Sequence, residues 1–262
     1  MGRLIALALL ALACAYPAQA RPQRVVSVNL CTDEYLLLLA DRSQILSITK
    51  LGADIQETPL AARAKGLLIN NGRLSSIITH KPDLLITGGY TEPFSMALAK
   101  HLHIATLNLP PPSTPEDVRQ NLRKLARAIG QEARAEHIIA RYDRLLAHPP
   151  QQAVRGALVE GGGYTVSATG LAATYLRAAG IAQIAAGDRL SYEMLLRDPP
   201  QVLVLSRYHE AQASTYQQWL AHPALARVRQ RAQFIEMDGR SWTCLGPMAA
   251  EAIPALRKAV RR

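Results

Sequence analysis

The stretch IITHKPDLLIT, residues 77–87, is echoed by LLRDPPQVLVL at residues 195–205. Each stretch has the pattern of a helix end, then a turn with proline, then a short apolar run typical of a buried strand. The same unit therefore occurs once in each half of a 262-residue chain. This repetition predicts two lobes of similar construction.

Strands and helices alternate around both copies of this unit. Apolar and β-branched runs predict strands at 25–29, 45–49, 81–87 and 104–109, and again at 157–159, 200–206 and 234–237. Thr32 or Asp33 is placed to cap a helix through Leu39, and further helices are expected at 93–102 and 171–179. The alternation predicts an α/β fold of two Rossmann-like lobes with mainly parallel sheets.

A long helical stretch separates the two halves. Thr114 is a predicted N-cap, Pro115 suits the first helical position, and Gly130 punctuates the stretch. Its later part, residues 131–147, would be about 25 Å long, enough to bridge two lobes. We therefore expect an N-terminal lobe at 21–114, a helical segment with the inter-lobe helix at 115–148, and a C-terminal lobe at 149–262.

The first twenty residues, MGRLIALALLALACAYPAQA, have the layout of a secretory signal peptide. Arg3 precedes an apolar run that is shorter than the about 20 residues needed to span a bilayer. Residues 18–20, Ala-Gln-Ala, form an A-x-A cleavage signal, so we expect cleavage after Ala20 and an exported mature chain. The alternatives are a buried N-terminal helix and a lipoprotein acylated on Cys14.

The chain is basic, with a formal net charge of +10. A basic protein can bind nucleic acid, an anionic surface or an anionic small ligand. The Lys and Arg residues are scattered, which favours a solvated basic surface, and an exported protein has no nucleic acid to meet. We expect a small-molecule ligand and no nucleic-acid partner.

The order of these features resembles the periplasmic binding proteins of ABC importers for ferric siderophores, haem and cobalamin. The resemblance is carried by RVVSVN at 24–29, KPDLLI at 81–86, the helix at 131–147 and SYEMLLRDP at 191–199, and it covers essentially the whole mature chain. It implies two α/β lobes joined by a long rigid helix, with the ligand in the cleft between them. It also implies a monomeric, periplasmic, non-enzymatic protein without a cofactor, whose partner is an importer permease.

Members of this group dock on the permease through one acidic residue on each lobe. Glu193 falls on the C-terminal position, whereas Ser75 occupies the N-terminal one, so the second docking acid stays unassigned. Gly88 stands where cobalamin binders would have a tryptophan. Because a basic protein suits anionic ferric chelates, we expect an iron chelate such as a ferric siderophore first, cobalamin second and haem third.

Ligands of open α/β sheets lie beyond the carboxyl ends of the strands. That rule selects five loops, in which aromatic and cationic side chains gather although aromatic residues are scarce in this chain. We expect ligand contacts from Asn29, Cys31, Tyr90, Tyr164, Arg207, Tyr208, Arg240 and Trp242. No metal-ligand motif occurs, so no metal site is expected; Tyr208 or His209 as an axial haem ligand is the alternative.

Cys31 and Cys244 are the two cysteines of the expected mature chain. They could form a disulfide between the lobes, remain free thiols that touch the ligand, or be small buried apolar groups. A rival function is a secreted α/β enzyme that uses one of these thiols or the glycines at 161–163. No base or orienting residue is identifiable beside either thiol, which favours the binding protein.

Overall fold

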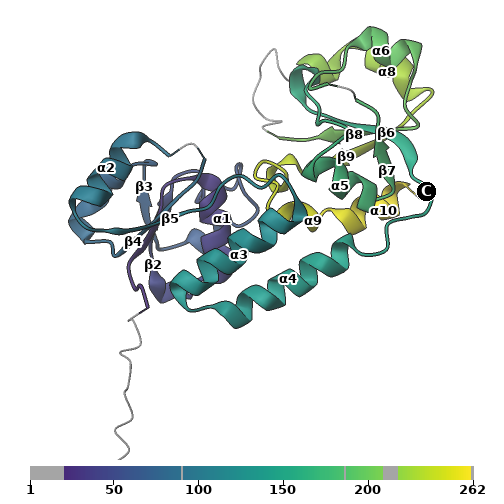
Figure 1. Ribbon diagram of the computed structural model, residues 1–262. Coiled ribbons are helices and arrows are strands. Elements are labelled where there is room, and N and C mark those ends of the chain that lie inside the picture. The colour runs from purple at the N-terminus through teal and green to yellow at the C-terminus, as the bar shows by residue number, and fades with distance from the viewer. Residues whose placement is uncertain (1–20, 90, 186, 209–217, 261–262) are drawn as a thin grey trace, which may run out of the picture.

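The computed structural model describes residues 21–89, 91–185, 187–208 and 218–260. Two parallel sheets, each flanked by helices, divide this part of the chain into two lobes (Figure 1). We name the lobe built on the first sheet the N-lobe and the lobe built on the second sheet the C-lobe. The α/β fold with two parallel-sheet lobes that the sequence predicts is thus confirmed.

The sheet of the N-lobe has the strand order β3-β2-β1-β4-β5, and each neighbouring pair is parallel. Its strands are β1 (Val25–Ser27), β2 (Ile45–Thr49), β3 (Leu68–Asn70), β4 (Leu84–Thr87) and β5 (Ala105–Asn108). They are connected by helices α1 (Leu30–Leu39) and α2 (Pro93–His101) and by the 3-10 turns η1 (Arg42–Gln44), η2 (Ala61–Ala64), η3 (Leu74–Ser76) and η4 (Ile78–His80).

The sheet of the C-lobe has the strand order β7-β6-β8-β9, again with parallel neighbours. Its strands are β6 (Val154–Val159), β7 (Ile181–Gln183), β8 (Val202–Ser206) and β9 (Gln233–Met237). The connecting elements are α5 (Leu171–Ala178), α6 (Tyr192–Arg197), α8 (Pro223–Arg229), α9 (Pro247–Ala250), α10 (Ile253–Val260), η5 (Gly161–Gly163), η6 (Trp219–Ala221) and η7 (Gly239–Ser241).

Both lobes use one topology. The chain leaves the first strand of each lobe to one side and returns to its other side, so the strand order reverses between β1 and β4 and between β6 and β8. The two echoed stretches of sequence end in β4 and β8, which hold equivalent places in the two sheets. The residues before β4 form the 3-10 turn η4, whereas those before β8 form helix α6.

The sequence missed two strands and misplaced one helix start. β3 and β7 are three-residue strands at the sheet edges, too short to show a pattern. Helix α1 begins at Leu30, and its cap is Asn29 rather than Thr32 or Asp33. The Asn29 side chain accepts a hydrogen bond from the Cys31 amide, and its extended backbone suits an N-cap.

The helical stretch after residue 114 is a hairpin of α3 (Pro115–Ile129) and α4 (Glu132–Leu146). Thr114 caps α3 in a capping box with Asp117, as the sequence predicts. Gly130 ends α3 in the left-handed region at φ 71°, which lets the chain reverse. The Arg119–Asp143 and Arg123–Glu136 ion pairs show that the two helices run antiparallel.

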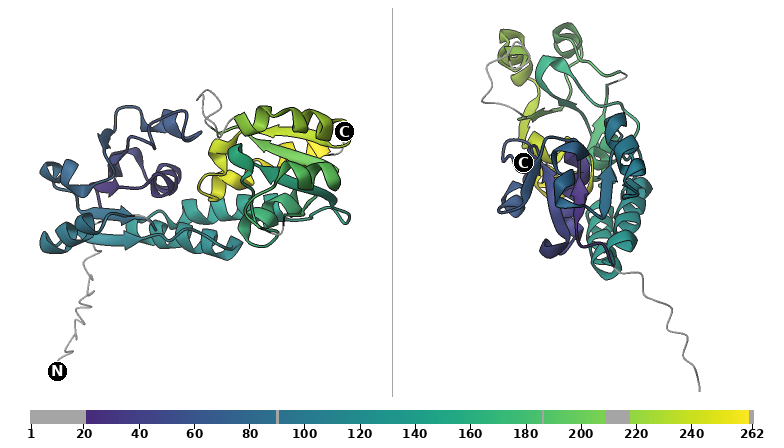
Figure 2. Two further views of the ribbon diagram at one scale, coloured as in Figure 1. Left: turned by 90° about the horizontal axis from the view of Figure 1, so that it is seen from above. Right: turned by 90° about the vertical axis from the view of Figure 1, so that its left-hand side faces the viewer.

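Helix α4 joins the lobes, and Figure 2 shows the α3–α4 layer running along both of them. Near its start, Arg134 donates to the Leu39 carbonyl and pairs with Asp41 of the N-lobe. Near its end, Arg141 pairs with Glu251 between α9 and α10. One cluster of buried side chains includes residues of both sheets and of α4, so the lobes share a core. Within the described ranges, no helix is both long and apolar enough to span a bilayer.

Candidate functional site

The carboxyl ends of the C-lobe strands lie against the N-lobe. Tyr208 follows β8 and donates a hydrogen bond of 2.5 Å to the carboxylate of Glu57 in the N-lobe. Arg240 follows β9 and donates to the carbonyl of Ile55. Loops at a point where strand order reverses are the usual ligand sites of such sheets, and here those of β8 face the other lobe. The candidate site is therefore the space between the lobes.

A disulfide joins Cys31 to Cys244 at this junction. Cys31 lies in the first turn of α1, Cys244 follows η7, and their Cα atoms are 5.2 Å apart. Of the three states that the sequence left open, the structure has the bridge. The bond links positions 213 residues apart and fixes the start of α1 to the C-lobe. With both cysteines paired, neither is a free thiol nucleophile.

A cavity of about 250 Å³ lies beside the disulfide. Its lining comes from the ends of β1 and β4, from the residues before α3, and from the chain around Cys244: Asn29, Cys31, Thr32, Tyr35, Gly88, Gly89, Leu109, Pro110, Pro111, Pro112, Thr243, Cys244 and Leu245. Most of these groups are small or apolar, so the N-lobe side is a wall of backbone and proline rather than of long polar side chains.

Gly88 and Gly89 are glycines because the wall is tight. A Cβ atom on Gly88 would lie 3.0 Å from Oδ1 of Asn29, and one on Gly89 would lie 2.7 Å from Cδ of Pro111. Asn29 is itself occupied as the cap of α1, with 2.9 Å from the Cys31 nitrogen to its Oδ1. The absence of a tryptophan at residue 88 thus has a steric reason in this chain.

Arg207 and Arg240 both have carboxylate partners. Arg240 holds Asp238 through several hydrogen bonds, one of 2.8 Å, and Arg207 pairs with Glu236. The Arg240 guanidinium lowers the pKa of Asp238, which is the sign of a favourable ion pair. An anionic ligand at either arginine would compete with a carboxylate already in place. Positive charge alone therefore gives weak support for an anionic ligand at this site.

Tyr164 in the loop after β6 and Arg189, which follows β7, form a stacked pair. Tyr164 is 43% exposed, and the Arg189 guanidinium carbon lies 4.5 Å from the centroid of its ring. Arg189 also donates to the Gly162 carbonyl at 2.7 Å, which ties it to the same loop. A cation over an aromatic face offers both charge and flat area to a ligand. The sequence analysis missed Arg189, since nothing local marks it as a neighbour of a loop 25 residues away.

Trp242 lies in the shared core and not on an open surface. It is 4% exposed and meets Tyr175 edge to face, with the ring centroids 5.8 Å apart. Tyr175 donates to the Leu245 carbonyl and accepts from Tyr142 of α4 at 2.9 Å. Because its ring is enclosed by the protein, we leave Trp242 out of the ligand surface. The polar residues around Trp242 in the sequence gave no sign of this burial.

Helix α1 carries two buried carboxyl groups, of which Asp33 was a candidate cap in the sequence analysis and Glu34 had no predicted role. Asp33 and Glu34 on α1 are 0% and 1% exposed. Burial raises the pKa of Asp33 to about 8 and that of Glu34 to about 7. Asp33 accepts from the Thr49 hydroxyl at 2.5 Å, and Glu34 accepts from the Thr58 hydroxyl at 2.7 Å. The two carboxyls thus bind the chain on either side of the segment that contains Glu57.

The remaining expected residues lie apart from the cleft or outside the description. Glu193 is exposed in the first turn of α6, where hydrogen bonds from its own amide and from Ser191 lower its pKa. Ser75 is exposed in η3. Tyr90 and His209 lie outside the described residues. In the part that is described, no three His, Cys, Asp or Glu side chains gather as a metal site.

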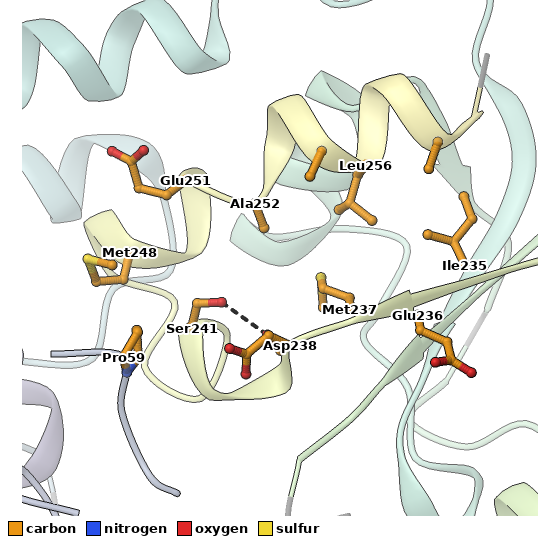
Figure 3. A pocket seen from close by; sticks show the side chains of 12 residues that line it. Pro59, Ile235, Glu236, Met237, Asp238, Ser241, Met248, Glu251, Ala252 and Leu256 are labelled. Carbon is orange, nitrogen blue, oxygen red and sulfur yellow. Dashed lines mark hydrogen bonds between the residues drawn. The ribbon is translucent and has the colours of Figure 1, made fainter. Parts of the chain in front are cut away.

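A second cavity, of about 340 Å³, lies along the outer side of β9 (Figure 3). Ile235, Met237, Met248 and Leu256 give it an apolar lining, and Pro59 of the N-lobe stands at one end. Glu251 at its rim pairs with Arg141. None of the residues expected from the sequence lines this cavity.

A family described as periplasmic binding protein matches residues 25–233. A search of curated protein sequences found no match.

Solved structures share the fold at low sequence identity. A periplasmic haem-binding protein from Pseudomonas aeruginosa is 21% identical, covers 91% of this chain and 92% of its own, and gives a TM-score of 0.71. The periplasmic vitamin B12 binding protein of Vibrio cholerae is 16% identical; the alignment covers 91% of this chain and 96% of that protein, with a TM-score of 0.64. A Helicobacter pylori protein solved with Ni(II) bound is 13% identical; the alignment covers 92% of this chain and 84% of that protein, with a TM-score of 0.68. At these identities the similarity establishes the fold.

Proposed function

The chain belongs to the periplasmic binding protein family, and from that premise we propose that it captures a metal chelate between its lobes and delivers it to an ABC importer permease. The observation that carries the proposal is the meeting of the lobes at their strand ends: Tyr208 and Arg240, which follow β8 and β9, contact the N-lobe. Ligands of open α/β sheets bind beyond these ends, so both lobes can contribute to one site.

The ligand class follows from the surfaces on the two sides. The N-lobe offers glycine, proline and the disulfide, which suit a flat or bulky apolar body. The C-lobe offers Tyr164, Arg189 and Tyr208, which can meet polar groups at the periphery of a chelate. Relatives in fold are described as binding haem, vitamin B12 or Ni(II). We propose an iron chelate such as a ferric siderophore, with a cobalamin-type ligand as the next candidate.

The rest of the transport route is part of the same proposal. The signal peptide is removed after Ala20, and the mature protein works as a monomer in the periplasm. Glu193 docks on a cationic site of the permease, because it is exposed and its carboxylate stays ionised over a wide pH range. A thiol enzyme is disfavoured, since Cys31 and Cys244 are bonded to each other.

A ligand titration tests the proposed class. The purified mature protein is titrated with ferric desferrioxamine, cyanocobalamin and haemin, and native mass spectrometry of protein from periplasm identifies any ligand carried along. We expect one equivalent of an iron chelate or a corrinoid to bind, with quenching of tryptophan fluorescence. A ligand of another class, such as a sugar or an amino acid, would overturn the proposal.

A charge reversal tests the docking role. Glu193→Arg should abolish transport and leave ligand affinity unchanged, since like charges across an interface cost several kcal/mol. Ser75→Ala is the matched change on the N-lobe and should be nearly silent. Loss of ligand binding in Glu193→Arg would instead assign Glu193 to the cleft.

A further inference from the structure

We propose that residues 50–59, here named the strap, set the spacing of the two lobes, and that Glu57 is the residue that positions Tyr208 at the cleft. The ligand-binding part of this inference rests on the proposed function, whereas the lobe spacing does not. The strap belongs to the N-lobe by sequence, following β2, but its middle contacts the C-lobe.

Both ends of the strap are fixed to helix α1. Before its first residue, the Thr49 amide and hydroxyl donate to Asp33, the hydroxyl at 2.5 Å. Near its last residue, the Thr58 hydroxyl donates to Glu34 at 2.7 Å. A Cβ atom on Gly52 would lie 2.4 Å from Oδ2 of Asp33, so the strap is pressed against the helix there. These contacts are buried, and they hold the strap as one piece with α1.

Among the described residues, the middle of the strap reaches the C-lobe through polar contacts at Ile55 and Glu57. The Ile55 carbonyl accepts from Arg240, and the Glu57 carboxylate accepts from Tyr208 at 2.5 Å. Tyr208 follows the buried strand β8 of the C-lobe, and Asp238 fixes Arg240 in the same lobe. Each contact therefore joins a residue that is anchored in one lobe to a residue that is anchored in the other.

Apolar packing does not replace these contacts. Ile55 is 68% exposed, although it is the largest apolar residue in the middle of the strap. Beyond it, Pro59 faces Met248 and Ser241 across the cavity of about 340 Å³, as Figure 3 shows. In the described part of the chain, Ile55 and Glu57 of the strap reach the C-lobe through hydrogen bonds. Such bonds exchange with water and can be released more easily than a packed core.

The strap and the disulfide hold one segment of the C-lobe from two sides. Cys244 is bonded to Cys31 of α1, and Arg240, four residues earlier, is held by the strap. Asp33 and Glu34 follow Cys31 by two and three residues, so the same turn of α1 carries the disulfide and the strap anchors. The lobe spacing at the cleft thus depends on α1, and a cleft already held at its working width binds its ligand without the cost of ordering.

Hydrogen–deuterium exchange of the full-length mature protein without ligand tests the strap. Glu57→Ala and Tyr208→Phe should each speed amide exchange of residues 50–59 by about tenfold, and the double variant should add little, because both remove the same bond. Glu57→Gln keeps an acceptor oxygen and should restore most of the protection. Small-angle scattering should show a larger radius of gyration for the two single variants.

Two matched controls remove similar groups inside one lobe. Tyr192→Phe deletes a hydroxyl that donates to the Trp219 carbonyl of the same lobe. Glu116→Gln weakens a pair with Arg119 on the same helix. Neither control should change exchange of the strap or the radius of gyration.

The outcomes separate the strap from the proposed function. Unchanged amide exchange in Glu57→Ala and Tyr208→Phe, or additive effects in the double variant, would contradict the proposal that the strap sets the lobe spacing. This outcome does not depend on which ligand the protein binds. If exchange of residues 50–59 responds as expected but the protein binds none of ferric desferrioxamine, cyanocobalamin and haemin, the strap proposal stands and the proposed ligand class is wrong. For a probe that binds the wild type, Glu57→Ala should weaken affinity about tenfold and Glu57→Gln much less. Equal affinity in Glu57→Ala would remove the positioning role.

Discussion

The back and the front of the lobe junction are joined by opposite kinds of contact. At the back, Tyr142 of the inter-lobe helix α4 packs edge to face against Tyr175 of the C-lobe, which meets Trp242 in the same way; this aromatic junction of α4 with the C-lobe is almost fully buried. At the front, the strap meets the C-lobe through Glu57–Tyr208 and Ile55–Arg240, beside a disulfide. The back excludes water and fixes the shape of the molecule, whereas the front sets the spacing of the lobes through hydrogen bonds that can exchange with water and through one covalent bond.

Mutations in the aromatic junction should lower the free energy of unfolding more than mutations at the front. Trp242→Ala removes a buried ring against Tyr175, and the expected loss of unfolding free energy is about 3–5 kcal/mol. Urea unfolding followed by circular dichroism measures it. Trp242→Phe is the control, because it keeps an aromatic ring in the site and should lose less. Unchanged stability with a large loss of ligand affinity would return Trp242 to the ligand surface that its sequence position suggests.

The disulfide should have the next largest effect. Replacing Cys31 and Cys244 by serine should lower stability by about 2–4 kcal/mol, since the bond closes a loop of 213 residues in the unfolded chain. Thermal unfolding of the double variant, of the reduced wild type and of Cys31→Ser alone should give similar losses. Thiol titration of the denatured, unreduced mature protein should find no reactive thiol, and two thiols would contradict the bridge.

The fold could be predicted from the sequence because its signals are local. The β-branched run at Val25 and the apolar run at Leu84 are central strands whose neighbours bury them on both faces, so their composition is distinctive. Thr114 and Pro115 mark the start of α3 through local cap chemistry. The edge strands β3 and β7 have three residues each, too few for a period to appear.

The junction could not be predicted, because its residues are brought together only by the lobe arrangement. The strap, KLGADIQETP between 50 and 59, has no periodicity that would mark Glu57 as the partner of Tyr208 in the second half. Trp242 looks like a loop residue by sequence, and its burial depends on α4 and α5. The cysteines could be named, but only the distance of 5.2 Å between their Cα atoms decides their state.

The stability contributed by the buried carboxyls that anchor the strap should also depend on pH. The pKa of Asp33 is raised to about 8 and that of Glu34 to about 7, against about 4 for carboxyls in an unfolded chain. Between pH 4 and these raised pKa values the folded state therefore binds more protons than the unfolded state. The two carboxyls contribute their full stabilisation of the fold below about pH 4, and this stabilisation is lost as the pH rises through 7 to 8. The slope is at most about 1.4 kcal/mol per pH unit for each carboxyl.

Asp33→Asn isolates this effect. The amide keeps an oxygen that can accept from the Thr49 amide, but it no longer titrates. Stability of the variant, measured by urea unfolding from pH 4 to 9, should depend less on pH than that of the wild type. Parallel curves for the two proteins would show that the buried carboxyl keeps an ordinary pKa. Exchange of residues 50–59 should rise with pH in the wild type beyond the intrinsic rate, because Asp33 anchors the strap.

The smallest expected effect concerns Asn29, the N-cap of α1, because this cap starts the helical turn that carries the disulfide and the strap anchors. Asn29→Ala removes the oxygen that accepts from the Cys31 amide, and the expected loss of stability is about 1 kcal/mol. Asn29→Asp keeps the acceptor and should be nearly neutral. The turn that the cap begins carries Cys31, Asp33 and Glu34, so a weaker cap should loosen the strap before it affects the aromatic junction. Hydrogen exchange at 50–59 and at 139–146 compares the two regions directly. If ligand affinity falls in Asn29→Asp as much as in Asn29→Ala, the side chain acts on the ligand and not as a cap.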